Sequence, residues 1–330
     1  MKVAIFGAGV IGERRGSQLP GHTLVGIFDP DSKKAALLAE KLKTKIWTDG
    51  DAMLTQSGAE IIIVATTNNQ LAPISLKAVE NKKHVLVEKP GAITLQELTT
   101  LEAAAKKNKV AVKVGFNHRF HPAVLKAQSM VDQGAIGKLM FLRARYGHGG
   151  RLNYEKEWRA NPTLSGGGEL IDQGVHVLDL IYWFAGPLPL QSSFVATSFW
   201  KMNVDDNAVL TLGDKNKWAT FHVSCTEWKN SFALELYGTT GKLLIQGLGR
   251  SYGPESLTHY KMTAEMGPPQ VAQYEFPVDD QSWRLDLENL AEHISKGSPL
   301  LGDLQSARYA LTQVRQAYRD NGYSSLPCSV

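Results

Sequence analysis

The stretch Met1-Lys2-Val3-Ala4-Ile5-Phe6-Gly7-Ala8-Gly9-Val10-Ile11-Gly12 decides the fold of the first part of the chain. It consists of an apolar run of strand length followed by the pattern Gly-x-Gly-x-x-Gly. The residues after it have helical character as far as Pro20-Gly21. A strand, a glycine-rich turn and a helix in this order predict the first unit of a parallel α/β sheet. We therefore interpret the N-terminal apolar run as a strand and not as a signal peptide.

The alternation of strand and helix signals continues to about residue 118. Further strands are expected at 23–28, 60–65, 84–87 and 110–116, and helices at 32–42, 73–81 and 95–108. The apolar runs lack a period of two, which is typical of strands that are buried on both faces of a parallel sheet. These observations predict a doubly wound Rossmann domain over residues 1–118.

The pattern changes in the rest of the chain. Helices are expected at 122–133, 170–184, 283–296 and 303–321, and strands at 139–146, 192–201, 208–212, 218–225, 232–237 and 242–246. Gly213-Asp214-Lys215-Asn216 and Gly238-Thr239-Thr240-Gly241 supply turns between consecutive strands. Residues 119–330 are therefore predicted to form an α+β domain with an open, mostly antiparallel sheet.

Composition excludes several classes of protein. The 330 residues carry 36 basic and 32 acidic side chains, a formal net charge of +4 that is too small and too dispersed for a nucleic-acid-binding surface. No apolar stretch approaches the ~20 residues of a membrane helix. The two cysteines, Cys225 and Cys328, match no disulfide framework and no metal-ligand spacing, so we expect a cytoplasmic protein without a metal.

The glycine-rich turn predicts a dinucleotide site. Gly7 permits the tight turn, Gly9 lets the backbone approach a pyrophosphate, and Gly12 lets helix and strand pack closely. Asp29 ends the second strand, near the spacing at which a carboxylate meets the adenosine ribose. It would accept hydrogen bonds from ribose hydroxyls and repel a 2′-phosphate, which favours NAD over NADP, although Lys33 and Lys34 soften that repulsion.

Two further motifs carry groups suited to acid–base chemistry. Glu88-Lys89-Pro90 closes the fourth strand, at the sheet edge where ligands bind in this architecture, and a lysine there can hydrogen-bond a substrate hydroxyl. Asp172 and His176 lie four residues apart in a helical stretch, on one face. His176 can act as a general base, and Asp172 either orients it or binds the substrate directly.

Other polar clusters have a simpler interpretation. His118 and His121 have the spacing of half a metal site, but no companion pair exists, so we interpret them as surface or loop histidines. Arg143 and Arg145 alternate on one face of a strand. That face is either solvated, or it contacts a subunit or an anionic substrate group.

Taken together, these motifs resemble the Gfo/Idh/MocA family of glucose–fructose oxidoreductase, inositol 2-dehydrogenase and their relatives. The resemblance covers nearly the whole chain. It rests on the Gly7–Gly12 motif, Glu88-Lys89-Pro90, Gly115-Phe116-Asn117 with Arg119, and Gly166-Gly167-Gly168 leading to Asp172 and His176. It implies a Rossmann domain, a second domain with an open sheet, and oxidation of a secondary hydroxyl of a sugar or cyclitol with a nicotinamide cofactor.

The resemblance also assigns residues. It implies that Lys89, Asp172 and His176 form the catalytic group and that the Lys89–Pro90 peptide is cis. The expected cofactor contacts are Gly7, Gly9, Val10, Ile11, Gly12, Asp29, Thr66, Asn68, Glu88 and Lys89. The loop Thr66-Thr67-Asn68-Asn69-Gln70 lacks the Pro and His that commonly follow its Thr in the family.

The expected substrate contacts are Lys89, Asn117, Arg119, Arg151, Tyr154, Trp158, Arg159, Asp172 and His176. Arginines and aromatics between Gly147 and Arg159 suit a sugar that carries a carboxylate, phosphate or nucleotide diphosphate. The alternative function is a non-catalytic, NAD-binding regulator on the same fold, for which Lys89, Asp172 and His176 are not needed together.

The second sheet predicts assembly. Residues 139–248 contain more strand than the few helices can cover on both faces, and Trp218 and His222 share a face that the helices leave open. Phe199 and Trp228 add to this apolar surface unless the loop 249–269 covers it. A homodimer or homotetramer through this sheet is therefore expected, as the resemblance also implies.

Overall fold

The computed structural model describes residues 1–249, 251–277 and 279–329. They form two compact units. The first comprises Met1–Asn117 with Trp283–Arg308, and the second comprises His118–Ser282 with Tyr309–Val330. Among the described residues, no helix combines the length and the apolar character that crossing a membrane requires.

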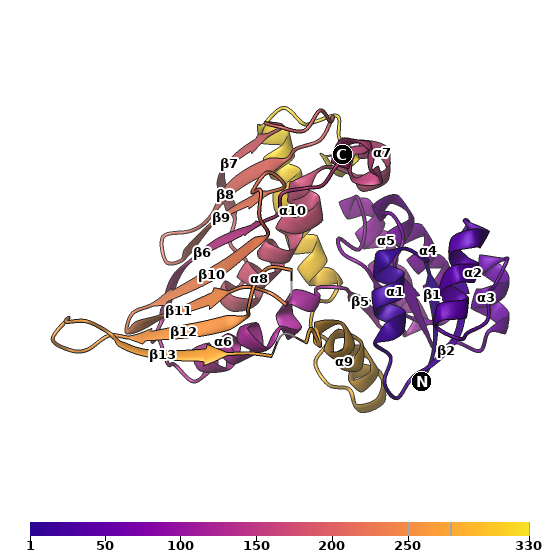
Figure 1. Cartoon of the computed structure of the whole chain (residues 1–330), viewed down its shortest axis with the longest axis horizontal. Helices are drawn as coiled ribbons and strands as arrows, with labels where there is room; N and C mark the ends of the chain where they lie inside the picture. The colour runs from indigo at the N-terminus through magenta and orange to yellow at the C-terminus, as the bar shows by residue number, and fades with distance from the viewer. Residues whose placement is uncertain (250, 278, 330) are drawn as a thin grey trace. The chain divides into compact units, whose positions relative to one another are not determined.

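The first unit is built on a five-stranded parallel sheet with strand order β2-β1-β3-β4-β5 (Figure 1). Its strands are β1 (Lys2–Phe6), β2 (Thr23–Phe28), β3 (Ile61–Val64), β4 (His84–Val87) and β5 (Val112–Val114). Its helices are α1 (Val10–Ser17), α2 (Ser32–Lys41), α3 (Gly50–Gln56), α4 (Asn68–Glu80) and α5 (Leu95–Asn108). The order changes direction between β1 and β3, so the predicted doubly wound fold is confirmed.

A late segment of the chain completes the first unit. Helix α9 (Ser282–Lys296) contributes Leu287 and Leu290 to the apolar core that contains Val3 and Ile5. The sequence prediction placed residues 283–308 in the second domain, whereas Trp283–Arg308 lies in the first unit. Burial of these leucines explains the placement, because the core around β1 provides the apolar surface that the amphipathic helix needs.

The second unit is built on an eight-stranded sheet with order β13-β12-β11-β10-β6-β9-β8-β7. Its strands are β6 (Leu139–Gly147), β7 (Leu190–Ala196), β8 (Asn207–Gly213), β9 (Trp218–Ser224), β10 (Ser231–Gly238), β11 (Gly241–Gln246), β12 (Ser256–Lys261) and β13 (Gln270–Glu275). All neighbours are antiparallel except β6 and β9, which are parallel. The predicted open, mostly antiparallel sheet is confirmed.

Strands β12 and β13 fall in or next to a segment that the sequence suggested as a covering loop. Their sequences, Ser-Leu-Thr-His-Tyr-Lys and Gln-Val-Ala-Gln-Tyr-Glu, are largely polar, and β13 is almost entirely exposed. An edge strand of this kind lacks the apolar pattern by which a buried strand is recognised. The segment therefore extends the sheet by two strands.

Helices cover one face of this sheet, on the side where Figure 1 shows α6 (Pro122–Asp132), α8 (Val175–Ala185) and α10 (Leu304–Asp320). Short helical turns complete the unit: η1 (Asn117–Phe120), η2 (Tyr154–Lys156), η3 (Trp158–Ala160), α7 (Pro162–Ser165), a π-helical turn η4 (Leu170–Gly174) and η5 (Pro327–Ser329). Leu142, Phe221 and Leu234 are buried on the strand faces that pack in the core. The helices thus leave the opposite face of the sheet without a helical cover.

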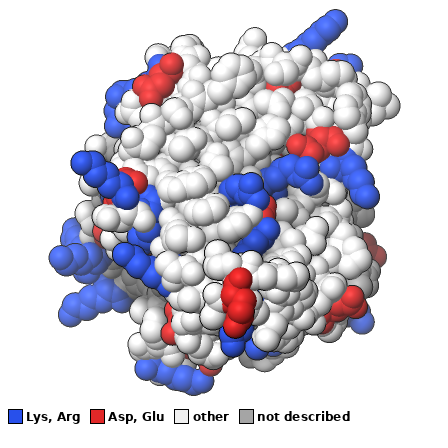
Figure 2. All heavy atoms as spheres, turned by 90° about the vertical axis from the view of Figure 1, so that its left-hand side faces the viewer, with Lys and Arg blue, Asp and Glu red and all other residues white. Residues whose placement is uncertain are grey.

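Aromatic rings mark the uncovered face. Phe141 stacks on Trp218 at 4.4 Å and on Tyr237 at 4.2 Å between ring centroids. The Trp218 residue keeps 41% of its surface exposed. Figure 2 shows this side of the molecule as a broad area of uncharged residues interrupted by a few charged side chains. Arg143 is one of the charged residues of this face, and it is paired there with Glu235 at 3.0 Å.

Candidate active site

The glycine-rich loop has the geometry that a pyrophosphate needs. Gly7 has φ +104°, and a Cβ there would lie 2.2 Å from the carbonyl oxygen of Ala65. A Cβ on Gly12 would lie 2.0 Å from the carbonyl oxygen of Gly7, whereas one on Gly9 would meet no atom within 4 Å. Gly9 is the N-cap of α1 and brings no side-chain cap to the helix. The loop thus leaves open space beside the helix N-terminus, where Val10 is exposed and Ile11 half-buried.

Asp29 is fixed by two backbone amides. Its Oδ2 accepts a hydrogen bond from the amide of Ala8 at 2.7 Å, and its Oδ1 accepts one from the amide of Asp31 at 2.8 Å. The carboxylate is thereby held against the glycine-rich loop, and each oxygen retains a further lone pair for a ribose hydroxyl. Lys34 pairs with Asp31 at 3.5 Å, so its charge is directed to that neighbouring carboxylate.

The loop after β3 places the next two predicted cofactor contacts. Thr66 is half-buried and its hydroxyl donates to the carbonyl of Thr67 at 3.3 Å. Asn68 is buried and begins α4, for which Thr67 is the N-cap. Both residues lie at the carboxyl end of β3, the edge at which ligands bind in a parallel sheet of this order.

Glu88 belongs to a buried network of four charges. Arg15 Nη2 lies 2.7 Å from Glu88 Oε1, Arg15 Nη1 lies 2.7 Å from Asp286 Oδ2, and Lys113 Nζ lies 3.1 Å from Asp286 Oδ1. Arg15 is 1% exposed, and its guanidinium also lies 4.6 Å from the Trp283 ring. Burial raises the pKa of Glu88, while the nearby Arg15 opposes that rise. The network contains two positive and two negative groups, so its charges compensate one another.

The network precedes Lys89 directly in the chain. It ties the end of β4 to helix α1 of the dinucleotide motif and to α9. The Lys89–Pro90 peptide bond is cis, as the family resemblance implies. The structure therefore places Glu88 where it fixes the backbone at Lys89.

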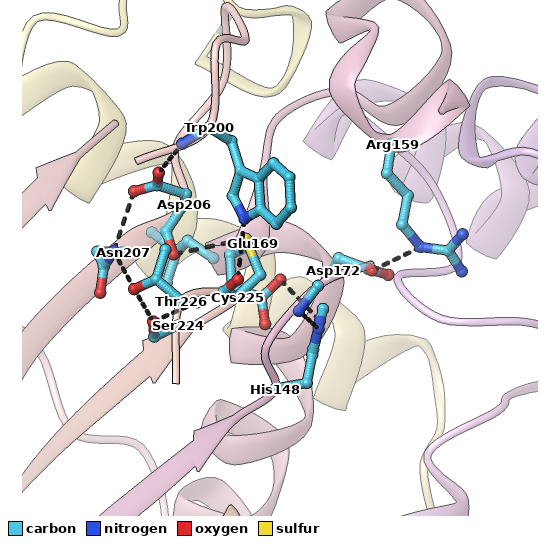
Figure 3. Close-up of polar contacts among 12 residues, drawn as sticks. His148, Arg159, Glu169, Asp172, Trp200, Asp206, Asn207, Ser224, Cys225 and Thr226 are labelled. Carbon is cyan, nitrogen blue, oxygen red and sulfur yellow. Dashed lines mark hydrogen bonds and ion pairs between the residues drawn. The ribbon is translucent and has the colours of Figure 1, made fainter. Parts of the chain in front are cut away.

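In the second unit, Asp172 and His176 lie at the start of α8. Asp172 belongs to the π-helical turn Leu170–Gly174, and His176 lies in the first turn of α8. Both are buried, and Arg159 Nε donates to Asp172 Oδ2 at 2.9 Å (Figure 3). The π-helical turn is the detail that a simple four-residue helical spacing does not predict, and such turns are frequent at functional sites.

Two aspartates that the sequence analysis did not single out position this turn and a neighbouring loop. Asp205 accepts from the amides of Gly168 at 2.9 Å and Leu170 at 2.8 Å, and from the Tyr318 hydroxyl at 2.6 Å. Burial raises the pKa of Asp205 to about 6. Asp206 accepts from three consecutive amides, 198–200, at 2.7–2.9 Å. In the sequence, two consecutive acidic residues directly before a predicted strand were the signal that could have indicated this role.

The buried Glu169 and the half-buried His148 form a second polar pair beside Asp172 (Figure 3). Glu169 is 2% exposed, and its Oε2 lies 3.5 Å from His148 Nε2. The other ring nitrogen of His148 accepts the amide of Gly150 at 3.0 Å. Burial raises the pKa of Glu169 to about 7, although the contact with His148 opposes the rise. The sequence analysis missed Glu169, whose signal was its position directly after three glycines.

We expect the buried Glu169 carboxyl to make the protein less stable as pH rises. Its pKa is raised in the folded chain, so between pH ~4.5 and ~7 the unfolded state has lost a proton that the folded state keeps. The free energy of unfolding should therefore fall across this range, and less so in Glu169→Gln. Urea unfolding at several pH values measures the effect. Glu155→Gln, a substitution at a less buried acid in η2, is the control, and equal slopes in both variants would contradict the expectation.

His118 and His121 lie in the short connection between β5 and α6, but both are buried, so the expectation that they are exposed surface histidines is wrong. His121 Nδ1 lies 2.9 Å from Glu255 Oε2, and His118 Nε2 lies 3.0 Å from the Tyr146 hydroxyl. These polar partners allow the imidazoles to be buried. Within the described residues, no group of three or more His, Cys, Asp and Glu is placed to hold a metal ion.

Some of the other expected substrate contacts are buried in the structure, and others lie at the surface. Arg119 forms a buried bidentate pair with Asp179, at 2.8 and 2.6 Å. Tyr154 is buried against His148 and Trp200, with centroid distances of 5.6 and 5.4 Å.

Arg151 is exposed and pairs with Glu157, and Trp158 lies under the guanidinium of Arg159 at 4.6 Å. Asn117 is buried at the end of the first unit. Arg159, which is also predicted to meet the substrate, is paired with the predicted catalytic residue Asp172.

Known proteins resemble this chain over both units. Scyllo-inositol 2-dehydrogenase (NAD(+)) of Bacillus subtilis (strain 168) is 24% identical over 322 residues, which cover 93% of this chain and 90% of the relative. D-glucoside 3-dehydrogenase of Escherichia coli (strain K12) is 29% identical over 232 residues, covering 68% and 64% of the two chains. A solved structure of levoglucosan dehydrogenase in complex with NADH has a TM-score of 0.86 at 19% identity, over 97% of this chain and 98% of that chain.

Sequence models of one family match two parts of the chain. The model described as "Oxidoreductase family, NAD-binding Rossmann fold" matches residues 1–116. The model described as "GFO/IDH/MocA C-terminal domain" matches residues 124–244. The two matches follow each other in the order of the two units and cover most of the chain. The chain therefore belongs to the Gfo/Idh/MocA family of oxidoreductases, with the NAD-binding Rossmann fold of that family in its first unit.

Proposed function

We propose that this chain is an NAD-dependent dehydrogenase that oxidises a secondary hydroxyl of a sugar, cyclitol or sugar derivative, or reduces the corresponding ketone. The observation that carries the proposal is the buried pair Asp172 and His176 at the start of α8, in a chain whose family has an NAD-binding first unit. The relatives named for scyllo-inositol and D-glucosides support polyhydroxylated substrates. Arg159 beside Asp172 suits a substrate with acceptor oxygens.

Each part of the chain has a role in the proposed mechanism. The glycine-rich loop and Asp29 hold the pyrophosphate and the adenosine ribose. NAD supplies the hydride acceptor when it is bound. His176 takes the proton from the reacting hydroxyl as a general base, and Lys89 donates a hydrogen bond to the same oxygen, which favours its ionisation. Asp172 orients His176 or holds a substrate hydroxyl, and Arg159 compensates its charge.

An activity screen with NAD and with NADP tests this proposal. The panel contains sugars, cyclitols, glycosides and sugar acids. The near-ultraviolet absorbance of the reduced nicotinamide should rise with at least one polyol and NAD. A His176→Ala sample on the same panel controls for contaminating dehydrogenases. Saturable NAD binding with no absorbance change across the panel would instead favour the non-catalytic regulator.

We expect Asp29→Ala to weaken NAD binding by about tenfold and to narrow the preference for NAD over NADP. The variant loses hydrogen bonds from a charged group to the ribose, and it also loses the repulsion of a 2′-phosphate. Titration of both cofactors by fluorescence measures the two affinities. Asp49→Ala removes a carboxylate that caps α3, and it should leave the preference unchanged. A wild-type protein that binds NADP more tightly would contradict the role of Asp29.

We further propose that the uncovered face of the second sheet is the contact between subunits of a homodimer or homotetramer. The stacked rings of Phe141, Trp218 and Tyr237 and the exposed Phe194 form an aromatic surface there. Apolar surfaces of this kind are usually interfaces, and a twofold contact between two such faces is the simplest closed assembly.

Light scattering at micromolar concentration should therefore give two or four times the chain mass of 36.2 kDa. Trp218→Glu should shift the mass downward, because it places a charge in the proposed contact. Leu37→Glu on α2 makes the same change at another exposed apolar residue and should leave the mass unchanged. A wild-type mass equal to that of one chain would exclude this assembly.

A further inference from the structure

The ring of His118 lies flat on the ring of His176. The two ring centroids are 3.8 Å apart and the planes are inclined by 14°. His118 is 8% exposed and His176 is 4% exposed, so the stack is buried. His118 belongs to η1 and His176 to the first turn of α8, and both lie in the second unit. A group in direct ring contact with the proposed general base is in a position to control its orientation and its charge.

The plane of the His118 ring is itself fixed by its neighbours. His118 Nε2 lies 3.0 Å from the Tyr146 hydroxyl. His121 and Phe232 meet the ring with their edges at centroid distances of 5.6 and 6.3 Å. Burial and a hydrogen bond with Tyr252 raise the pKa of Tyr146 well above its ordinary value, so the hydroxyl keeps its proton. We assign this hydroxyl as the donor to His118 Nε2, with the ring proton of His118 on Nδ1. Accepting this hydrogen bond favours the neutral form of His118.

A neutral His118 ring favours a single positive charge on the stacked pair, located on His176. An imidazolium gains from contact with the face of a neutral aromatic ring, whereas two imidazoliums at this separation repel each other. The charged groups of the surrounding elements are themselves paired: Asp172 with Arg159, Glu169 with His148, Arg119 with Asp179, and His121 with Glu255. Tyr252 lies against Tyr146 with a centroid distance of 5.0 Å.

We propose that His118 is a positioning residue for His176, whose neutral ring holds the plane of the His176 imidazole and restricts the stacked pair to one positive charge. In this arrangement the proton taken from the substrate hydroxyl resides on His176, and the Tyr146 hydroxyl keeps His118 from competing for it. The role of His118 rests on the general-base role proposed above for His176. It adds to that role a reason why the base is oriented and why the stacked pair carries only one extra proton.

NMR titration of the histidine rings in the protein without substrate tests the pair independently of any activity. We expect the wild-type pair to take up one proton on His176 and to resist a second one at pH values far below the ordinary histidine pKa of about 6.5. His118→Phe keeps a stacking ring and should leave His176 titrating as in the wild type. His118→Leu keeps the apolar volume without a ring, and it should lower the pKa of His176 by about one unit.

Turnover gives the second readout. His118→Leu should lower kcat by about tenfold with little change in KM, and His118→Phe should retain most of kcat. Tyr146→Phe leaves the ring stack in place but removes the hydroxyl that keeps His118 neutral. In the titration the shared proton should then move from His176 to His118. This variant tests the proposal if the His118 variants do not fold. Two histidines that titrate independently in the wild type, or equal behaviour of His118→Leu and His118→Phe, would overturn the proposal. If the wild-type pair takes up one proton as expected but the protein oxidises no polyol, the result supports the role of His118 in the stacked pair. It then counts against the proposed dehydrogenase function alone.

Discussion

Replacing His176 with alanine should lower kcat by about 10²–10⁴-fold, the usual contribution of a general base. NAD binding should change little, because the residues proposed to hold NAD lie in the first unit and His176 lies in the second. Steady-state turnover with an active polyol and a separate titration of NAD measure the two effects. Lys89→Ala should also reduce turnover, because the hydrogen bond that favours ionisation of the hydroxyl is lost.

The matched control is His22→Ala, at a half-buried histidine outside the proposed catalytic group. Its kcat should equal that of the wild type. A His176→Ala enzyme with near wild-type kcat would remove His176 from the role of base. Since His176 also stacks on His118, thermal unfolding of the variant should be compared with that of the wild type, so that a loss of turnover is not confused with a loss of fold.

Replacing Arg15 with methionine should destabilise the protein by about 3–5 kcal/mol. The substitution removes the cation that contacts both buried carboxylates, so Asp286 keeps its contact with Lys113 while Glu88 loses its 2.7 Å contact. An uncompensated charge in a buried position is among the most costly defects that one substitution can create. Urea unfolding followed by fluorescence measures the change in the free energy of unfolding.

Arg14→Met on the same helix is the control. Arg14 is exposed, and its contact with the Trp283 ring is longer, at 5.8 Å, so the substitution should cost less than about 1 kcal/mol. Equal destabilisation by the two variants would mean that the buried network contributes nothing beyond an ordinary surface arginine. A second variant, Arg15→Met with Glu88→Gln, should recover part of the lost stability, because it neutralises the carboxylate that loses its 2.7 Å contact with Arg15.

Most strands could be predicted because their apolar pattern reflects burial. The runs at Val3–Phe6 and Ile61–Val64 are buried on both faces, and the alternation in Ser231–Gly238 matches a sheet with one covered face. Strand β13 could not be predicted, because an exposed edge strand carries no such signal. The position of α9 could not be predicted either, since an amphipathic helix indicates that it has an apolar partner but not which one.

Motifs in the sequence point to Lys89, Asp172 and His176, whose catalytic roles are proposed above. Contacts made by packing carry no such local signal. The short sequence around His118 gives no sign that its ring stacks on a histidine 58 positions later. The motif likewise predicts Glu88 as a cofactor contact. Its charge partner Arg15 is distant in the sequence, and Asp286, which also contacts Arg15, is more distant still. Contacts of high sequence separation are invisible to local patterns.

The late position of α9 has a consequence for synthesis on the ribosome. Domains usually fold in order from the N-terminus as the chain emerges. Here Asp286, Leu287 and Leu290 are translated only after all the strands of the second sheet. Until then Arg15 has Glu88 but lacks its second charge partner, Asp286, and the core around Val3 and Ile5 lacks part of its cover. We expect the NAD-binding unit to complete its fold last. Nascent chains arrested before residue 283 should remain sensitive to protease in this region, although they already contain every glycine of the dinucleotide motif.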